Sequence, residues 1–131
     1  LYTDVSLLTA RPEFGADASA FFNTLTGRSP FVHLERLSMA PFGLRERLLS
    51  LIRSETDRAR QGEEAAIWLK MNALEDRRMI EALYEASQAG VQVRLNVRGI
   101  CCLRPGVRGV SDNISVVSII DRYLEHARIY W

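Results

Sequence analysis

The sequence predicts an α/β fold in which helices flank a mostly parallel sheet. The main observation is that short segments typical of strands alternate with amphipathic helical segments through the second half of the chain. A second observation is that these strand segments are apolar, as expected for strands covered by helices. The length of 131 residues, 47% of them hydrophobic, suits one domain or one domain with a piece of a neighbour.

The first part of the chain is predicted to contain two helices and two short strands. Residues 5–10 form an apolar stretch that suits a strand, and residues 12–25 place apolar side chains at helical spacing. Residues 27–30 interrupt the pattern with Gly and Pro and are the best candidate for a linker. Residues 32–40 alternate loosely, so we expect a strand in their second half. Residues 44–59 show the clearest amphipathic helix.

Strands and helices alternate after residue 60. Residues 65–71 and 91–97 suit strands, and the segment between them suits a helix. Asp76 is placed to cap the start of that helix, and Gly90 to follow its end.

The last part of the chain begins with a polar loop over residues 98–113. A β-branched strand follows over residues 114–120, and residues 121–125 allow a single helical turn. Residues 127–131 suit a final strand. Because open parallel sheets bind ligands at the carboxyl ends of their strands, we searched those ends for chemistry.

The composition excludes several classes of protein. With 17 Lys and Arg against 16 Asp and Glu, the chain lacks the basic excess of a protein that coats nucleic acid. No apolar run reaches the length of a membrane helix. The adjacent Cys101 and Cys102 form neither a disulfide framework nor a zinc site, so we expect reduced thiols in the cytoplasm.

Arg98 is the first candidate for binding an anion, because it directly follows a strand that is predicted to be buried. Its planar guanidinium suits phosphate oxygens, and Arg104 adds positive charge in the same glycine-containing loop. The alternative is a solvated loop whose arginines pair with neighbouring carboxylates.

His126 and Arg128 are the second group of candidates. If a strand begins here, their side chains point to the same side, where an imidazole and a guanidinium suit phosphoryl chemistry. The alternative is a histidine with a purely structural hydrogen bond. Lys70 and Asn72, at another strand end, either reach a ligand or finish a turn. No phosphate-binding loop, dinucleotide fingerprint or cluster of metal ligands is present.

Several motifs together resemble bacterial polyphosphate kinase over essentially the whole chain. The most specific are VRGICCLRPG at residues 97–106 and RYLEH at residues 122–126. The others are LYTD at 1–4, LLTA at 7–10, APF at 40–42, LR at 44–45, KMN at 70–72, LYEASQAG at 83–90 and SDNI at 111–114.

The resemblance implies part of an enzyme that reversibly transfers the terminal phosphate of ATP to inorganic polyphosphate, with Mg²⁺ and a phosphohistidine upstream of this sequence. It implies that residues 1–29 are the tail of one phospholipase-D-like C-terminal domain and residues 30–131 most of a second. The sequence lacks an initial Met and stops on an apolar strand segment, so we expect a truncated fold and an inactive fragment.

The resemblance also implies roles for individual residues. Tyr2, Arg98 and His126 match positions that contact ATP, and His126 is the second active-site histidine rather than the phosphohistidine. The magnesium ligands are expected upstream, so no metal site is expected here. Further candidates for phosphate binding are Lys70, Asn72, Arg104 and Arg128, although the phospholipase-D pattern has Lys where this chain has Arg128.

One other function stays open at this stage, an α/β module that binds anions or contacts another subunit without turnover. A phosphodiesterase of phospholipase-D type needs an intact H-x-K pair, which is missing here. The partners implied by the resemblance are ATP or ADP and polyphosphate, with no nucleic acid, in a homo-oligomeric cytoplasmic protein; peripheral association with the inner membrane is left open. The kinase interpretation requires Arg98 and His126 to converge.

Overall fold

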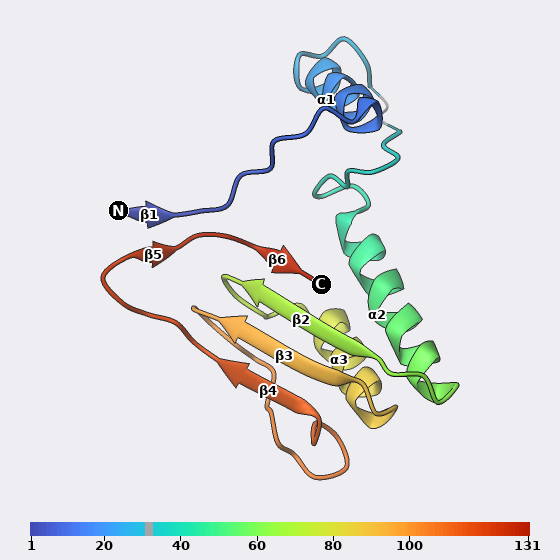
Figure 1. The fold of residues 1–131 in the computed structure, drawn as a ribbon, viewed down its shortest axis with the longest axis vertical. Helices are drawn as coiled ribbons and strands as arrows, with labels where there is room; N and C mark the ends of the chain where they lie inside the picture. The colour runs from blue at the N-terminus through green and yellow to red at the C-terminus, as the bar shows by residue number, and fades with distance from the viewer. Residues whose placement is uncertain (31–32) are drawn as a thin grey trace. The chain divides into compact units, whose positions relative to one another are not determined.

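The computed structural model describes residues 1–30 and 33–131, which form two compact units (Figure 1). One unit combines residues 1–5 with residues 48–131 and holds both sheets, and the other consists of residues 6–47. The domain boundary expected between residues 29 and 30 stays a prediction. No helix in the described ranges has the length and apolar character needed to cross a membrane.

A four-stranded sheet in the order β4-β3-β2-β6 forms the centre of the larger unit (Figure 1). The strands β2 (Ala66–Met71), β3 (Gln92–Val97) and β4 (Ile114–Val117) run parallel to one another. The short strand β6 (Ile129–Tyr130) pairs antiparallel with β2. The predicted α/β fold with a mostly parallel sheet is therefore confirmed.

The hydrophobic core lies where α2 (Leu44–Arg60) and α3 (Arg77–Gln88) pack against the sheet. Strand β3 alternates as its sequence predicts, because Val93, Leu95 and Val97 are buried and the residues between them are more exposed. The helices contribute a matching apolar stripe to the same cluster: Ile52 from α2, and Ile80, Leu83 and Ala86 from α3.

Helix α3 begins and ends as predicted. The side chain of Asp76 accepts a hydrogen bond from the backbone nitrogen of Met79 at 3.0 Å, which caps the first turn. Gly90 adopts a φ of 102°, a conformation that favours glycine after a helix. The capped helix returns the chain to the start of β3 and so leaves the ends of β2 and β3 side by side.

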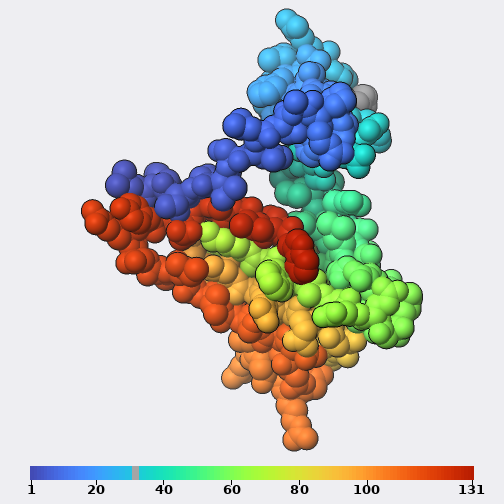
Figure 2. All heavy atoms as spheres, in the orientation of Figure 1, coloured from blue at the N-terminus to red at the C-terminus, as the bar shows by residue number. Residues whose placement is uncertain are grey.

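A second, two-stranded sheet pairs β1 (Tyr2–Thr3) with β5 (Leu124–Glu125) in parallel. Figure 2 shows the blue N-terminal segment against the red C-terminal segment. The helical turn predicted over residues 121–125 is wrong, because the amide of Leu124 donates to the carbonyl of Leu1 and not to its own helical turn.

Two other strand predictions near this sheet need correction. Residues 5–10 contain no strand, since the N-terminal pairing stops at Thr3. The strand predicted over residues 114–120 ends at Val117, because its registered partner residues on β3 end at Asn96.

The smaller unit contains α1 (Pro12–Leu25), which has the predicted bounds. The carboxylate of Asp17, buried on this helix, accepts hydrogen bonds from the backbone amides of Glu35, Arg36 and Leu37 at 2.7–3.0 Å. The strand predicted in the second half of residues 32–40 is therefore wrong, because successive amides of a strand point to opposite sides. Val32 itself lies outside the described residues.

Candidate functional site

An open cleft of about 490 Å³ lies where the carboxyl ends of β2 and β3 meet the segment that contains β5. Asn72 follows β2, and Arg98 and Gly99 follow β3. Leu1 and residues 119–125 complete the lining. This is the edge of the sheet at which the sequence predicts ligand binding.

The guanidinium of Arg98 is held by two hydrogen bonds that come from different segments. Its Nε donates to Oδ1 of Asn72 at 2.8 Å, and its Nη1 donates to the carbonyl oxygen of Glu125 at 3.1 Å. A guanidinium has five N–H donors, so these bonds orient its plane and leave donors for an anion. The alternative from the sequence was that the arginines of this loop pair with carboxylates. The partners of Arg98 are instead an amide oxygen and a backbone carbonyl.

Gly99 allows the two strand ends to approach this closely. Its amide donates to the carbonyl oxygen of Asn72 at 2.7 Å, and a Cβ added to Gly99 would lie 2.9 Å from that same oxygen. Any side chain here would push the backbone of Asn72 away, and with it the amide group that holds Arg98.

Lys70 belongs to the site through an ion pair. Its Nζ lies 2.7 Å from Oε2 of Glu125, and the hydroxyl of Thr3 donates to Oε1 of the same carboxylate at 3.0 Å. These two donors, Lys70 first, hold the pKa of Glu125 below its ordinary value. Lys70 and Asn72 thus lie at the predicted place, but the bonds they make are with Glu125 and Arg98.

The rings of Tyr2 and His126 are in contact on one face of the small sheet. Their ring centroids are 5.5 Å apart in an edge-to-face arrangement. Nδ1 of His126 is 3.4 Å from Oδ2 of Asp4, and the amide of His126 donates to the carbonyl of Thr3 at 2.9 Å. The backbone amide of Val5, followed by His126, lowers the pKa of Asp4, which favours a carboxylate beside the imidazole.

Arg98 and His126 approach each other through Glu125. The guanidinium is bonded to the carbonyl of Glu125, and the imidazole belongs to the next residue. The lining of the cleft by the described residues includes Arg98 but not His126. Arg98 and His126 are therefore close to each other, as the sequence predicts. They are connected through the backbone of Glu125 in β5 and do not both line the cleft.

Arg128 and Arg104 take other positions. Nη1 of Arg128 donates to the carbonyl of His126, and β6 begins only at Ile129, so the alternation expected for His126 and Arg128 does not apply. The amide of Arg104 donates to the hydroxyl of Tyr84 at 2.8 Å, which places its backbone beside α3. No recorded contact among the described residues joins Arg104 to Arg98.

Three contributors to the site were missed from the sequence: Thr3, Asp4 and Glu125. The only signal in the sequence was their position inside two motifs. Thr3 and Asp4 follow Tyr2 in LYTD, and Glu125 precedes His126 in RYLEH. Among residues 1–30 and 33–131, no group of three His, Cys, Asp or Glu could hold a metal ion. We assign no step to a metal in this part of the chain.

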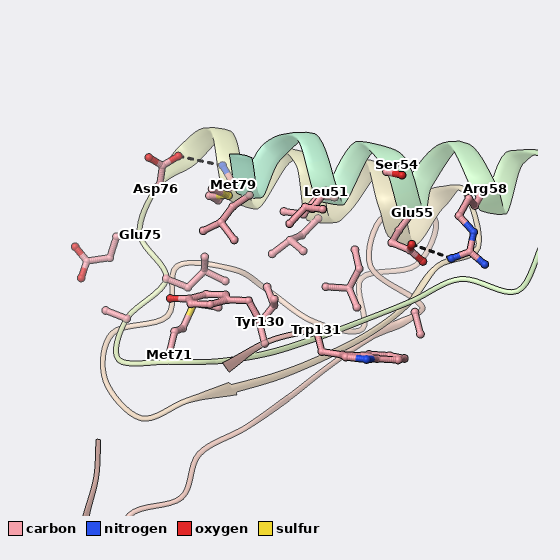
Figure 3. A pocket seen from close by; sticks show the side chains of 18 of the residues that line it. Leu51, Ser54, Glu55, Arg58, Met71, Glu75, Asp76, Met79, Tyr130 and Trp131 are labelled. Atoms are coloured by element: carbon pink, nitrogen blue, oxygen red, sulfur yellow. Dashed lines mark hydrogen bonds and ion pairs between the residues drawn. The ribbon is translucent and has the colours of Figure 1, made fainter. Parts of the chain in front are cut away.

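A larger hollow of about 810 Å³ lies between α2 and the strands β2 and β6 (Figure 3). Apolar side chains and rings line its middle, among them Leu51, Met71, Met79, Tyr130 and Trp131, and charged residues such as Glu55, Arg58 and Asp76 lie at its edges. None of the candidate residues from the sequence lines it. We therefore take the smaller cleft, where polar groups converge, as the candidate site.

Comparisons with known proteins identify the family of this chain. Residues 37–131 match the family model "Polyphosphate kinase C-terminal domain 2". Over the whole chain, the polyphosphate kinase of Rhodopirellula baltica is 56% identical and that of Bacillus cereus is 53% identical. The chain spans 15% and 19% of the lengths of these two relatives.

A solved structure shows the same fold. The crystal structure of polyphosphate kinase from Porphyromonas gingivalis matches with a TM-score of 0.87 and 39% sequence identity. The match covers 93% of this chain and 19% of that one. The resemblance found in the sequence motifs is thus confirmed by sequence and by fold.

Proposed function

This chain belongs to the polyphosphate kinase family, and from that premise we propose that it forms part of an enzyme that transfers the terminal phosphate of ATP reversibly to inorganic polyphosphate. The observation that carries the proposal is the bonding of Arg98 to the carbonyl of Glu125, directly beside His126. A cation with a fixed orientation can stabilise the charged oxygens of a transferred phosphoryl group, and a neighbouring imidazole can hold or pass on a proton.

Arg98 binds phosphate oxygens in this proposal. Because Asn72 and the carbonyl of Glu125 already orient its plane, little rearrangement is needed when an anion arrives. The remaining N–H donors then stabilise the charge on the oxygens as the phosphoryl group moves. Tyr2 contacts the nucleotide from the neighbouring strand.

His126 holds or moves a proton near the transferred group. The carboxylate of Asp4 lies near Nδ1 and stabilises a proton on that atom, so that Nε2 is the atom available to the ligand. The histidine that becomes phosphorylated belongs to another part of the full-length enzyme, as does the binding of Mg²⁺. We also propose that the parent enzyme is cytoplasmic and homo-oligomeric, in line with the family resemblance.

The proposal is tested in a full-length polyphosphate kinase that contains this sequence. We expect Arg98→Ala and His126→Ala each to lower polyphosphate synthesis from ATP by about a hundredfold or more, as loss of one preorganised group does elsewhere. Circular dichroism and thermal unfolding should match the unsubstituted enzyme. Near-normal rates in both variants would favour the non-catalytic anion-binding module.

A further inference from the structure

The carboxylate of Glu125 connects the two sheets of the larger unit. One oxygen pairs with Lys70 on β2 of the four-stranded sheet, and the other accepts from Thr3 on β1 of the two-stranded sheet. Lys70 and Glu125 have side chains that are 20% and 33% exposed, so the pair is partly shielded from water. Such shielding strengthens a charge-assisted hydrogen bond relative to one on an open surface.

The register of the small sheet decides which neighbours this contact fixes. Thr3 lies opposite Glu125, so both side chains point to one face, toward Lys70. The next residue along each strand points to the other face, as does Tyr2 before Thr3. The edge-to-face contact of Tyr2 with His126 and the approach of Asp4 to His126 agree with this alternation.

We propose that Lys70 and Glu125 are positioning residues, whose ion pair fixes the strand that carries His126 relative to Arg98. The inference rests on the proposed function, and it gives Lys70 a different role from the phosphate binding expected from the sequence. Glu125 has both connections: its side chain bonds to Lys70, and its carbonyl accepts from Arg98. Loss of the ion pair leaves the guanidinium and the imidazole chemically intact but lets the segment between them shift.

The competing assignment, in which Lys70 binds phosphate directly, makes a different prediction. If Lys70 contacts the ligand, Glu125→Gln releases the Lys70 ammonium from its ion pair, and synthesis stays unchanged or improves. If Lys70 positions the strand, Glu125→Gln is as harmful as Lys70→Met, because either change removes the same contact. Gln keeps an oxygen that can accept from Thr3, so the substitution removes the charge and not the shape.

The experiment measures kcat and KM for ATP in a full-length polyphosphate kinase that contains this sequence. We expect Lys70→Met and Glu125→Gln each to lower kcat about tenfold or more with a smaller change in KM, since misplacement by about 1 Å carries such a penalty. The double variant should lose little more than either single variant, because both changes remove one interaction. Lys70→Arg should recover most of the rate.

Arg60→Met is the matched control. Arg60 forms an ion pair of the same length, 2.7 Å, with Glu85 of α3, and it lies outside the site. We expect its kcat to equal that of the unsubstituted enzyme. Should Lys70→Met fail to fold by circular dichroism, Glu125→Gln and Lys70→Arg decide the question.

Three outcomes would overturn the inference: an unchanged kcat in Glu125→Gln, additive losses in the double variant, or a Lys70→Arg variant as slow as Lys70→Met. Failure of the proposed function would be seen differently. If that function is wrong, the unsubstituted full-length protein itself makes no polyphosphate from ATP.

Discussion

Nη1 of Arg98 lies 3.1 Å from the carbonyl oxygen of Glu125, a residue 27 positions later in the chain. At the same time, Nε of Arg98 donates to Oδ1 of Asn72 at 2.8 Å. The branched, planar guanidinium makes these two contacts from different nitrogen atoms and still offers donors to a ligand.

Arg98→Lys is therefore expected to be nearly as harmful as Arg98→Ala. An ammonium has three donors on one rotating nitrogen and lacks the planar fork that Asn72 and Glu125 orient, so we expect kcat for polyphosphate synthesis to fall about a hundredfold. Steady-state kinetics of the full-length enzyme measure this change. Arg94→Lys is the control, because Arg94 lies over the exposed ring of Trp68 at 5.2 Å, away from the cleft. Full activity in Arg98→Lys would show that charge alone matters at this position.

Gly99→Ala should damage the site without removing a functional group. The new Cβ would meet the carbonyl oxygen of Asn72 at 2.9 Å, so we expect a loss of about 1–3 kcal/mol in the free energy of unfolding and a lower rate. Chemical denaturation and kinetics of the full-length protein measure both. In contrast, Gly15→Ala on α1 has open space for its Cβ and should be neutral or slightly stabilising. Equal behaviour of the two variants would contradict the close approach described above.

The pairing of Glu125 should depend on pH in a defined direction. Its pKa is lowered in the folded state, first by Lys70 and then by Thr3, so the carboxylate stabilises the fold above the ordinary glutamate pKa of about 4.3. That contribution is lost as the pH falls through the lowered folded value. We expect amide hydrogen exchange at residues 124–126 to be faster in Glu125→Gln than in the unsubstituted protein near neutral pH. The difference should vanish in acid; a difference that grows in acid would mean that the pKa is raised instead.

Asp17→Asn is expected to loosen the segment that Asp17 holds. Its carboxylate accepts from three consecutive residues, and the amides of Leu37 and Glu35 are the main reason that the pKa of Asp17 is low. An Asn side chain would turn an N–H toward these donors, so we expect amide exchange at residues 35–37 to become about tenfold faster. Exchange at residues 92–97 serves as the internal reference. Unchanged exchange at residues 35–37 would show that the segment is held by other contacts.

Local sequence signals predicted the regular elements well. The bounds of α1 follow from Pro12 at its start and Gly27 after its end, and Asp76 marks the start of α3. The alternation in β3 separated buried from exposed residues correctly. These signals act within one or two turns of chain, so they are visible in a single sequence.

Two of the incorrect predictions share a physical cause, which is a partner far away in the sequence. A helical turn suits residues 121–125 locally, but their strand partner lies near the other end of the chain, where Thr3 pairs with Glu125. Residues 35–37 are likewise shaped by a carboxylate 18 to 20 positions earlier. The rule for strand ends identified Asn72 and Arg98, but no local pattern could reveal that Glu125 connects them to Lys70.

The parallel pairing of β1 with β5 joins segments separated by almost the whole length of this chain. Contacts between such distant segments carry an entropic cost of loop closure, and they can form only when both segments are present. During synthesis, Tyr2 must therefore wait for more than a hundred further residues to leave the ribosome before its aromatic partner exists. The candidate site therefore cannot be complete until residue 126 has been synthesised.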